Sequence, residues 1–448
     1  RGRLIRQLLT ESLFLAVAGG LAGMLVAVAL VDLLRVLAGG ILPRLSEIRI
    51  DATVLLFTVA LSLGTGFLFG LAPALHTARR ELTAALVSLG RGSAGRGVRA
   101  RDLLVAGQVA LSVVLLVGAG LMLKSLRELN QVDPGFDGPG VLTANVSLTA
   151  PQYQSRETAE RFWRDAVEGL RAIPGVTSAA AATSVPLSGW TDTNYWIEGQ
   201  PPASEAERRN AAIVTITEDY FRTLGIELTA GRDFGPSERS GGPAVAIVNQ
   251  SMAARLFPGE SPLGRRIVID FGRPYPTEIV GVAEDVKILD LSSPAPDMIY
   301  LSAFQGGGFG IRYLNLALRT DGDPTLLSRP LREIVAAIDR DLAIADLRTM
   351  EHRVSMATSR ERFITRLIGG FAVGVLVLAV VGLYGILGYS VSQRSTEIGI
   401  RLALGAERSQ VFRMVVQQGM LIVGAGIVVG LIAAVGLTRL LQSLLFQV

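Results

Sequence analysis

The chain has 448 residues, of which 50% are hydrophobic and only 18% are charged, with a formal net charge of +4. This composition is too apolar for an ordinary soluble protein and predicts membrane-spanning helices. The chain contains no cysteine, which excludes disulfides, thiolate metal sites and cysteine nucleophiles.

Five apolar runs are long enough to cross a bilayer. A spanning helix needs about 20 apolar residues, because the hydrocarbon core is about 30 Å thick. The sequence predicts spans at residues 13–31, 54–75, 103–123, 367–389 and 414–437.

The arginines of the short loops predict the orientation of these spans. The connector at 76–102 carries six arginines and one histidine against two acidic residues. Positively charged loops accumulate on the cytoplasmic side. This rule places the connector, the N-terminus and the loop at 393–413 in the cytoplasm, and the segment after Leu123 outside it.

The long segment at 124–362 mixes apolar and polar residues, and glycine and proline recur in it as turn signals. The pattern predicts strands and helices in alternation, and therefore a water-soluble α+β domain outside the cytoplasm. The strands are expected at 141–148, 176–183, 244–248, 278–283, 298–302 and 313–319, and the helices at 157–172, 249–256 and 325–338. Trp190, Tyr195 and Trp196 form either an exposed aromatic contact or part of the core, and the core is favoured.

An internal repeat relates the first and fifth spans. Residues 6–19 align without a gap to residues 413–426, so the two spans are predicted copies with the same orientation. Glycines four residues apart recur at matched positions and predict close helix packing; they are Gly19, Gly23, Gly426 and Gly430. The second copy lacks a partner for the 54–75 span, and the chain starts without methionine. We therefore expect a piece of a longer protein.

Catalytic chemistry finds little support in the sequence. The two histidines, His76 and His352, fall on opposite sides of the membrane in the predicted topology. No Walker A lysine loop is present, and the glycine-rich string at 90–95 lacks the strand and helix that a dinucleotide site requires. We therefore expect no catalytic, cofactor or metal site in this chain, and no ATP hydrolysis by it.

The loop between the last two spans predicts a short amphipathic helix at 396–404. Glu397 and Arg401 are four residues apart in the favourable order, apolar residues stack on one face, and Gly405 supplies a stop. Two interpretations remain open for this helix: a hairpin lying on the lipid surface, or a docking surface for a partner.

The string Arg394-Ser-Thr-Glu-Ile-Gly-Ile-Arg-Leu-Ala-Leu-Gly-Ala406 resembles the hallmark of FtsX-like permeases, the membrane subunits of type VII ABC systems. The segment before it is similar to the MacB-type periplasmic core domain. The resemblance implies a helical transmembrane bundle of FtsX-like repeats with a large extracytoplasmic α+β domain. It divides the chain into the end of a first repeat (1–75), a cytoplasmic arginine-rich linker (76–102), a helix opening the second unit (103–123), the periplasmic core (124–362) and a second repeat truncated after its second span (363–448).

The resemblance also implies a function. The loop helix would dock on a separate cytoplasmic ABC ATPase, which holds the ATP and magnesium, and its motion would reach the extracytoplasmic domain by mechanotransmission in export, efflux or envelope processes. The coupling residues carried over are Arg394, Glu397, Ile398, Gly399, Ile400, Arg401, Leu404, Gly405 and Ala406. The implied setting is the bacterial inner membrane, with lipid, a second permease in a homodimer or pseudo-dimer, and a periplasmic adaptor or cargo as partners, and no nucleic acid.

Two alternative functions differ from the permease in what they require. A membrane-anchored sensor or scaffold would use the outer domain for binding and would need no ATPase. A secondary transporter would need polar groups at mid-membrane, which the predicted spans mostly lack.

Overall fold

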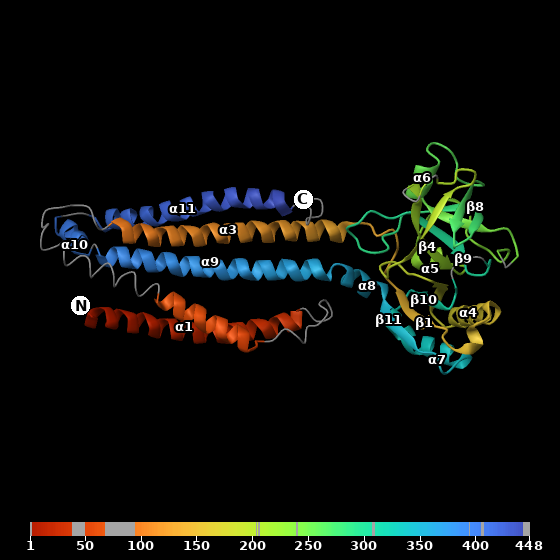
Figure 1. Cartoon of the computed structure of the whole chain (residues 1–448), viewed down its shortest axis with the longest axis horizontal. Helices are drawn as coiled ribbons and strands as arrows, with labels where there is room; N and C mark the ends of the chain where they lie inside the picture. The colour runs from red at the N-terminus through yellow and green to blue at the C-terminus, as the bar shows by residue number, and fades with distance from the viewer. Residues whose placement is uncertain are drawn as a thin grey trace. The chain divides into compact units, whose positions relative to one another are not determined.

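The computed structural model describes residues 2–37, 50–67, 95–202, 204, 207–238, 241–306, 310–393, 395–404 and 407–441. They form two compact units (Figure 1). The helical unit comprises the described residues up to Leu123 and from Arg360 onward, and the α+β unit comprises Lys124–Ser359.

Four described helices are long and apolar enough to span a membrane; the qualifying segments are Leu9–Arg35, Asp102–Gln131, Ser359–Tyr389 and Arg408–Arg439. They lie in helices α1 (Gly2–Leu37), α3 (Gly95–Gln131), α9 (Ser359–Gln393) and α11 (Arg408–Leu441). The predicted span at 54–75 is described only to Phe67, as the shorter helix Ala52–Phe67. Five spans therefore remain a prediction from the sequence.

The long helices present large apolar side chains on their outer surfaces. Val381 is 62% exposed, Phe371 57% and Leu421 75%. Contiguous apolar surface on this scale is rare in soluble monomers and marks a surface that another phase or molecule covers. A lipid bilayer is the environment that fits helices of this length and composition.

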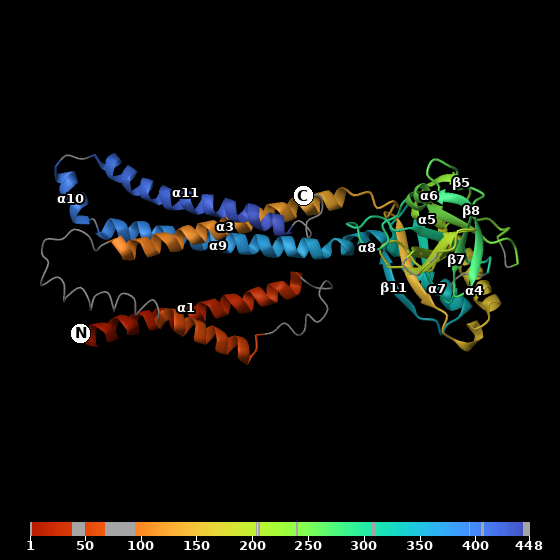
Figure 2. The ribbon, with the colours of Figure 1, turned by 45° about the horizontal axis from the view of Figure 1, so that its top comes forward.

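Glycines allow α3 and α11 to approach closely (Figures 1 and 2 show α3, α9 and α11 side by side). A Cβ placed on Gly426 would lie 2.7 Å from the Ala106 carbonyl oxygen, and one on Gly430 would lie 2.7 Å from the Ala110 carbonyl oxygen. Any larger residue would therefore separate the two backbones. Gly382 of α9 fits similarly against Gln108 of α3.

Gly19 and Gly23, the glycines of α1 that match Gly426 and Gly430, make no such close contact with the described residues. No described atom lies within 4 Å of a Cβ built on Gly19 or Gly23. The close contacts of α1 involve other positions: Gly66 of the Ala52–Phe67 helix meets the side chain of Ala16, and Gly20 meets Ser62. A helix-packing role for Gly19 and Gly23 stays a prediction, because the described residues include no neighbour for them.

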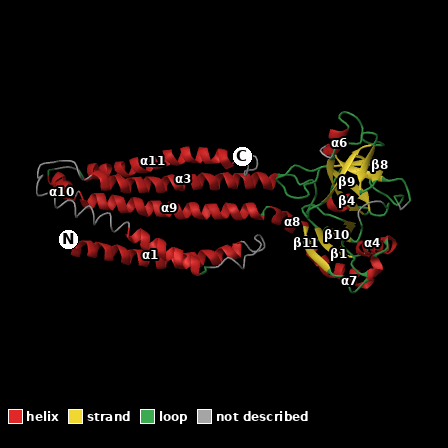
Figure 3. Cartoon of the chain, in the orientation of Figure 1, coloured by secondary structure: helices red, strands yellow, loops and turns green. Residues whose placement is uncertain are grey.

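The first lobe of the α+β unit is an antiparallel sheet in the order β11-β1-β10-β2. Its strands are β1 (Val141–Ser147), β2 (Val176–Ala182), β10 (Tyr313–Thr320) and β11 (Ile344–Thr349). Two amphipathic helices, α4 (Arg156–Arg171) and α7 (Ser328–Ile338), lie beside this sheet (Figure 3). Trp163 and Leu170 of α4 are fully buried against it.

The second lobe is a ring of paired strands in the order β4-β3-β7-β8-β6-β9, closed because β9 also pairs in parallel with β4. These strands are β3 (Thr191–Ile197), β4 (Arg209–Ile216), β6 (Val245–Asn249), β7 (Arg266–Asp270), β8 (Pro274–Ala283) and β9 (Met298–Ser302). Helix α6 (Gln250–Leu256) packs into their core, and β5 (Leu228–Gly231) pairs with β8.

The two lobes share one hydrophobic core. Their sheets touch at the single pair Ala182↔Ile216, between β2 and β4. Helix α5 (Tyr220–Leu224) contributes buried aromatic side chains to a cluster that also contains residues of both sheets. Tyr220 and Phe221 stack edge to face, with ring centroids 5.7 Å apart. The α+β unit is therefore one body with two lobes.

The sequence located six strands and the helices at 157–172 and 249–256 to within a few residues. It missed β3, β4, β5, β7, β11, α5 and α8 (Met350–Ala357). The predicted helix at 325–338 divides into a 3-10 turn (Pro324–Leu327) and α7, since Pro330 has no N–H to continue an earlier helix.

Candidate functional site

Helix α10 (Ser395–Ala403) occupies the turn between α9 and α11 (Figure 1). The structure starts and ends this helix one residue ahead of the predicted bounds. Three large apolar side chains on α10 and its last turn are exposed: Ile400 is 56% exposed, Leu402 40% and Leu404 82%. Ile400 and Leu404 are four residues apart and share one helix face, so these two side chains are the exposed apolar patch of α10. The patch lies outside the apolar windows of the long helices, at a turn where exposed residues are usually polar.

Gly399 lies in the middle of α10, where glycine destabilises a helix by about 1 kcal/mol relative to alanine. No described atom lies within 4 Å of a Cβ built at this position. Packing among the described residues therefore does not require a glycine here. A smooth, open helix face of this kind fits the close approach of another backbone.

One contact extends the last turn of α10, and another connects α10 to α11. The Leu404 backbone N–H donates to the Ile400 carbonyl oxygen at 3.0 Å, which extends the helical turn beyond Ala403. The Arg401 guanidinium Nη1 approaches the Met414 Sδ of α11 at 3.4 Å. Arg401 of α10 thus contacts the second turn of α11.

The predicted coupling residues fall into two groups. Ile398, Gly399, Ile400, Arg401 and Leu404 are described and lie together on α10 or its last turn. Outside the described residues lie Arg394, Gly405, Ala406 and the side chain of Glu397. The predicted Glu397–Arg401 pair and the stop at Gly405 therefore stay predictions.

Helix α8 is anchored within the α+β unit by a buried arginine. Arg353 is 7% exposed; its Nε donates to Thr143 Oγ1 at 2.9 Å, and its Nη2 donates to Asp346 Oδ2 at 2.5 Å. The side chain of Met350 is fully buried in the core that both lobes share. These contacts join α8 to β1 and β11.

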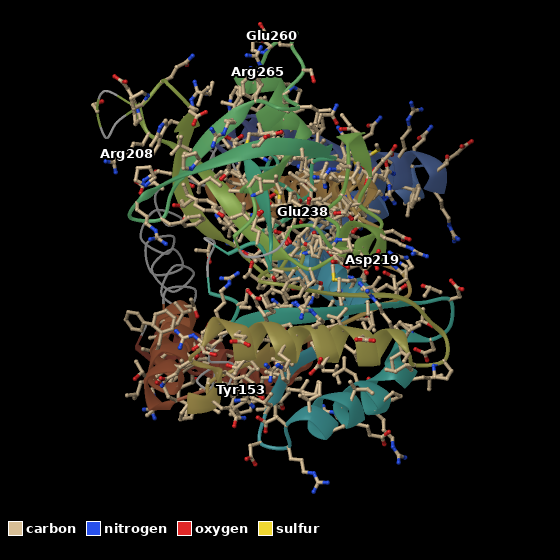
Figure 4. The ribbon with its side chains drawn as sticks, turned by 90° about the vertical axis from the view of Figure 1, so that its right-hand side faces the viewer. Tyr153, Arg208, Asp219, Glu238, Glu260 and Arg265 are labelled. Atoms are coloured by element: carbon tan, nitrogen blue, oxygen red, sulfur yellow. The ribbon has the colours of Figure 1, made fainter. Side chains whose placement is uncertain are left out.

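Two adjoining clefts open on the second lobe. One, of about 550 Å³, lies between Phe257, Ile197 and the loop before β7, and the other, of about 310 Å³, lies beside Trp196. Surface ion pairs cross the rim of the larger cleft: Arg265 contacts Glu260 at 2.7 Å and Arg266 contacts Glu198 at 3.2 Å. Figure 4 shows Glu260 and Arg265 together, apart from Glu238 and Asp219.

Of the three aromatic residues Trp190, Tyr195 and Trp196, one lies in the core and the others are at least partly exposed. Tyr195 is buried, as favoured, and its hydroxyl donates to the carboxylate of Asp297, which also pairs with Arg255. Burial raises the pKa of the Tyr195 hydroxyl. Trp190, by contrast, is 38% exposed and lines a third cleft, so the core interpretation was wrong for it.

The adjacent acids Glu284 and Asp285 have different surroundings. Burial raises the pKa of Glu284, and the neighbouring acids Asp133, Glu227 and Asp285 add to the effect. The Asp285 carboxylate instead accepts hydrogen bonds from Asn249 Nδ2 and from Ser251. Within the described ranges, no group of three or more His, Asp or Glu side chains is placed to hold a metal ion.

Comparisons with known proteins match two parts of the chain. Residues 104–334 match the sequence model of the MacB-like periplasmic core domain, and residues 369–448 match that of the FtsX-like permease C-terminal region. The first match covers more than half of the chain.

Two relatives match the chain at low sequence identity. An uncharacterised ABC transporter permease of Bacillus subtilis, YknZ, is 26% identical over 60% of this chain and 64% of its own length. The macrolide export ATP-binding/permease protein MacB of an Azoarcus species is 21% identical over 74% of this chain and 48% of its own length. The chain thus spans only part of both relatives. The periplasmic region of MacB from Actinobacillus actinomycetemcomitans aligns over 50% of this chain and 95% of that structure, with 16% identity and a TM-score of 0.33.

Proposed function

Because the chain belongs to the family of ABC transporter permeases with a MacB-like periplasmic core domain and an FtsX-like C-terminal region, we propose that α10 docks an ABC ATPase. The chain is a multi-pass membrane protein with an extracytoplasmic domain, the α+β unit. The ATPase binds and hydrolyses ATP with magnesium, and this permease couples that cycle to movement of the α+β unit.

The observation that carries this proposal is the exposed apolar patch of α10. Helix α9 begins at the α+β unit and crosses the membrane once, so α10 follows on the cytoplasmic side. An apolar patch rimmed by arginine suits a protein groove, because recognition helices bury their apolar face there. The uncovered helix face at Gly399 supports a close approach of the partner.

Mechanotransmission is supported by the continuity of the helices. Helix α9 has 35 residues without a break, which corresponds to about 52 Å at 1.5 Å per residue. It follows directly on α8, which Arg353 and Met350 fasten to the α+β unit. We propose that α9 carries a displacement at α10 along its length toward α8, which is anchored to β1 and β11.

The spans offer little support for a polar path through the membrane. The most apolar window of each of the four spanning segments contains no more than two charged residues. Secondary transporters place polar and ionisable groups near the midplane. A permease that moves an extracytoplasmic domain needs no such groups. The small number of charged residues in these windows therefore favours the permease over the secondary transporter.

The setting that follows is the bacterial inner membrane. The permease works there with lipid, a second permease copy or pseudo-dimeric partner, and an adaptor or cargo on the outer side. Macrolide export is the function named for one relative, and export or efflux is the class of process that we propose here.

The test introduces a single negative charge into the apolar patch. The full chain is purified in detergent with a candidate ABC ATPase, and association and ATP hydrolysis are measured for wild type, Ile400→Glu and Leu404→Glu. Burying a carboxylate in an apolar groove opposes docking, so we expect at least about a tenfold loss of association for each variant. Gln410→Glu is the matched control, since it adds the same charge at an exposed position at the start of α11.

The outcomes separate the functions. Loss of association in both patch variants, with the control unchanged, supports docking at α10. Wild-type association in both variants contradicts it. If wild type binds no ABC ATPase at all, the membrane-anchored sensor or scaffold replaces the permease as the better account.

A further inference from the structure

The third cleft of the α+β unit, which we call the Trp190 cleft, has a volume of about 380 Å³ and a lining that is almost entirely uncharged. Its side chains come from both lobes: Asn145 from β1, Asn315 from β10, and Ser188 and Trp190 from the loop before β3. Amides, hydroxyls and an aromatic ring dominate the surface. Such a set orients a neutral, polar ligand.

The one charged side chain in the lining already takes part in two ion pairs. Asp346 accepts from Arg353 Nη2 at 2.5 Å and pairs with Arg348 Nε at 2.6 Å. Neither arginine lines the cleft. An anion would therefore find no cation in the lining, and a cation would compete with two arginines for one carboxylate.

The amides are held in place before any ligand arrives. Asn145 and Asn315 are partners in the β1–β10 register, and Asn145 Nδ2 donates to Asn315 Oδ1 at 3.3 Å. Asn315 Nδ2 donates in turn to the Thr183 carbonyl oxygen at 3.1 Å. An asparagine amide offers two donor hydrogens and two acceptor sites. Asn145 Oδ1 also accepts from Ser147 Oγ at 3.3 Å, and Asn315 Nδ2 also donates to the Ala182 carbonyl oxygen at 3.5 Å. Asn145 therefore retains one donor hydrogen and one acceptor site for a ligand, and Asn315 retains one acceptor site. Fixed amides reduce the ordering cost of binding.

Trp190 lies on a loop that side-chain hydrogen bonds hold in place. Ser188 Oγ donates to the Val185 carbonyl oxygen at 2.7 Å, and Ser184 Oγ donates to the Gly189 carbonyl oxygen. Leu187 adopts a positive φ of 61°, which closes this tight loop. The ring at its end is 38% exposed. An exposed ring next to fixed amides combines a flat apolar face with hydrogen-bonding groups.

We propose that the Trp190 cleft binds a sugar unit of a neutral oligosaccharide. A pyranose has an apolar C–H face that suits the indole ring, and its hydroxyl or acetamido groups pair with the Asn145 and Asn315 amides. A purely apolar ligand would leave the remaining amide sites without partners, which opposes its binding. All residues that line the site belong to the α+β unit, so sugar binding can be measured without the ATPase.

The test uses the full chain in detergent and two uncharged probes, chitotetraose and maltotetraose, titrated by calorimetry. Chitotetraose carries acetamido groups and maltotetraose carries hydroxyls only. We expect saturable binding of at least one probe, weakened about tenfold by Trp190→Ala, since the ring contact is lost. Asn145→Leu removes the amide at similar volume and should weaken the same probe about fivefold or more.

The matched control is Trp196→Ala, which changes a tryptophan that lines a different cleft and should leave sugar binding unchanged. Near-ultraviolet circular dichroism checks that each variant is folded. Binding of chitotetraose alone assigns an acetamido sugar, and binding of both probes assigns the ring and hydroxyl contacts. The absence of binding at millimolar probe, or equal affinity in folded Trp190→Ala, overturns the proposal, whatever the result with the ATPase.

Discussion

The two units of the chain place their apolar residues in opposite ways. In the α+β unit, Leu170 is fully buried, and every residue of strand β9 is buried. In the helical unit, Leu421 is 75% exposed and Val428 57%. The same residue types therefore stabilise the two units against different surroundings: side chains in one, and lipid in the other.

The two units are therefore expected to be sensitive to different kinds of mutation. The α+β unit depends on tight side-chain packing and buried polar pairs, because water surrounds it. The helical unit gains little from exchanging lipid for protein around a leucine, and its geometry depends instead on glycines that let backbones meet. Three comparisons of matched variants and one pH titration test this contrast.

The largest effect is expected from removing equivalent side chains in the two units. Leu170→Ala leaves a cavity in the core beside Trp163 and should cost about 2–5 kcal/mol of the unfolding free energy of the α+β unit. Leu421→Ala, on a surface that lipid covers, should leave that free energy unchanged. Urea unfolding of the full chain in detergent, followed by tryptophan fluorescence, measures both. Equal losses would contradict the contrast.

An ion pair made by a buried arginine should contribute more to stability than a fully exposed pair. Arg353→Met removes the donors for Thr143 and Asp346 and should destabilise the α+β unit by about 2–3 kcal/mol. Arg329→Met removes an exposed pair with Glu333, at 2.7 Å, and should cause no measurable change. The same urea titration compares them, and an unchanged midpoint for Arg353→Met would remove the anchor from our account.

Within the helical unit, the position of a glycine should decide its importance. Gly430→Leu forces α11 away from the Ala110 backbone and should cost up to about 2 kcal/mol of helix packing. Gly424→Leu is the control, since no described atom lies near a Cβ at this position. Thermal unfolding in detergent, followed by far-ultraviolet circular dichroism, should show a lower midpoint for Gly430→Leu only. A similar shift in both variants would argue against close packing of α3 and α11.

The smallest effect is expected from a single titrating group of the α+β unit. Burial opposes ionisation of Glu238, yet the Gly235 N–H at 2.6 Å and Arg232 at 2.8 Å together hold its pKa below the usual 4.5. A lowered pKa stabilises the fold above pH 4.5, and this contribution is lost as the pH falls through the folded-state value.

Glu238→Gln tests this assignment. The variant should lose roughly 1 kcal/mol at pH 7 and show a flatter decline in stability between neutral and acid pH than wild type. Urea titrations at a series of pH values measure the slope. Parallel curves for variant and wild type would show that Glu238 contributes nothing to the acid sensitivity.

The sequence predicted long periodic elements well, because their signal is strong. Helix α4 repeats its apolar residues at helical spacing and begins at the Ser155 cap, and β9 is a compact apolar run between polar turns. The resemblance of the 394–406 string to FtsX-like permeases indicated the correct family, since residues 369–448 match the FtsX-like permease C-terminal region.

The missed elements are those whose structure depends on distant partners. Strand β7 has five residues, and β11 forms an edge whose pairing with β1 is interrupted by a bulge. Such short segments fit helix or strand equally until the sheet exists. The Trp190 cleft also escaped prediction, because Asn145 and Asn315 are 170 residues apart and meet only through the β1–β10 register.

Docking of an ABC ATPase at α10 can be tested by chemical cross-linking. The chain contains no cysteine, so Ile400→Cys, Leu404→Cys and Leu421→Cys each introduce a single reactive thiol into the full chain. With a bound ABC ATPase and a short thiol–amine cross-linker, Ile400→Cys and Leu404→Cys should form a permease–ATPase product, and Leu421→Cys should not. If the ATPase co-purifies with these variants while neither α10 thiol cross-links to it, the ATPase docks elsewhere and our account is contradicted.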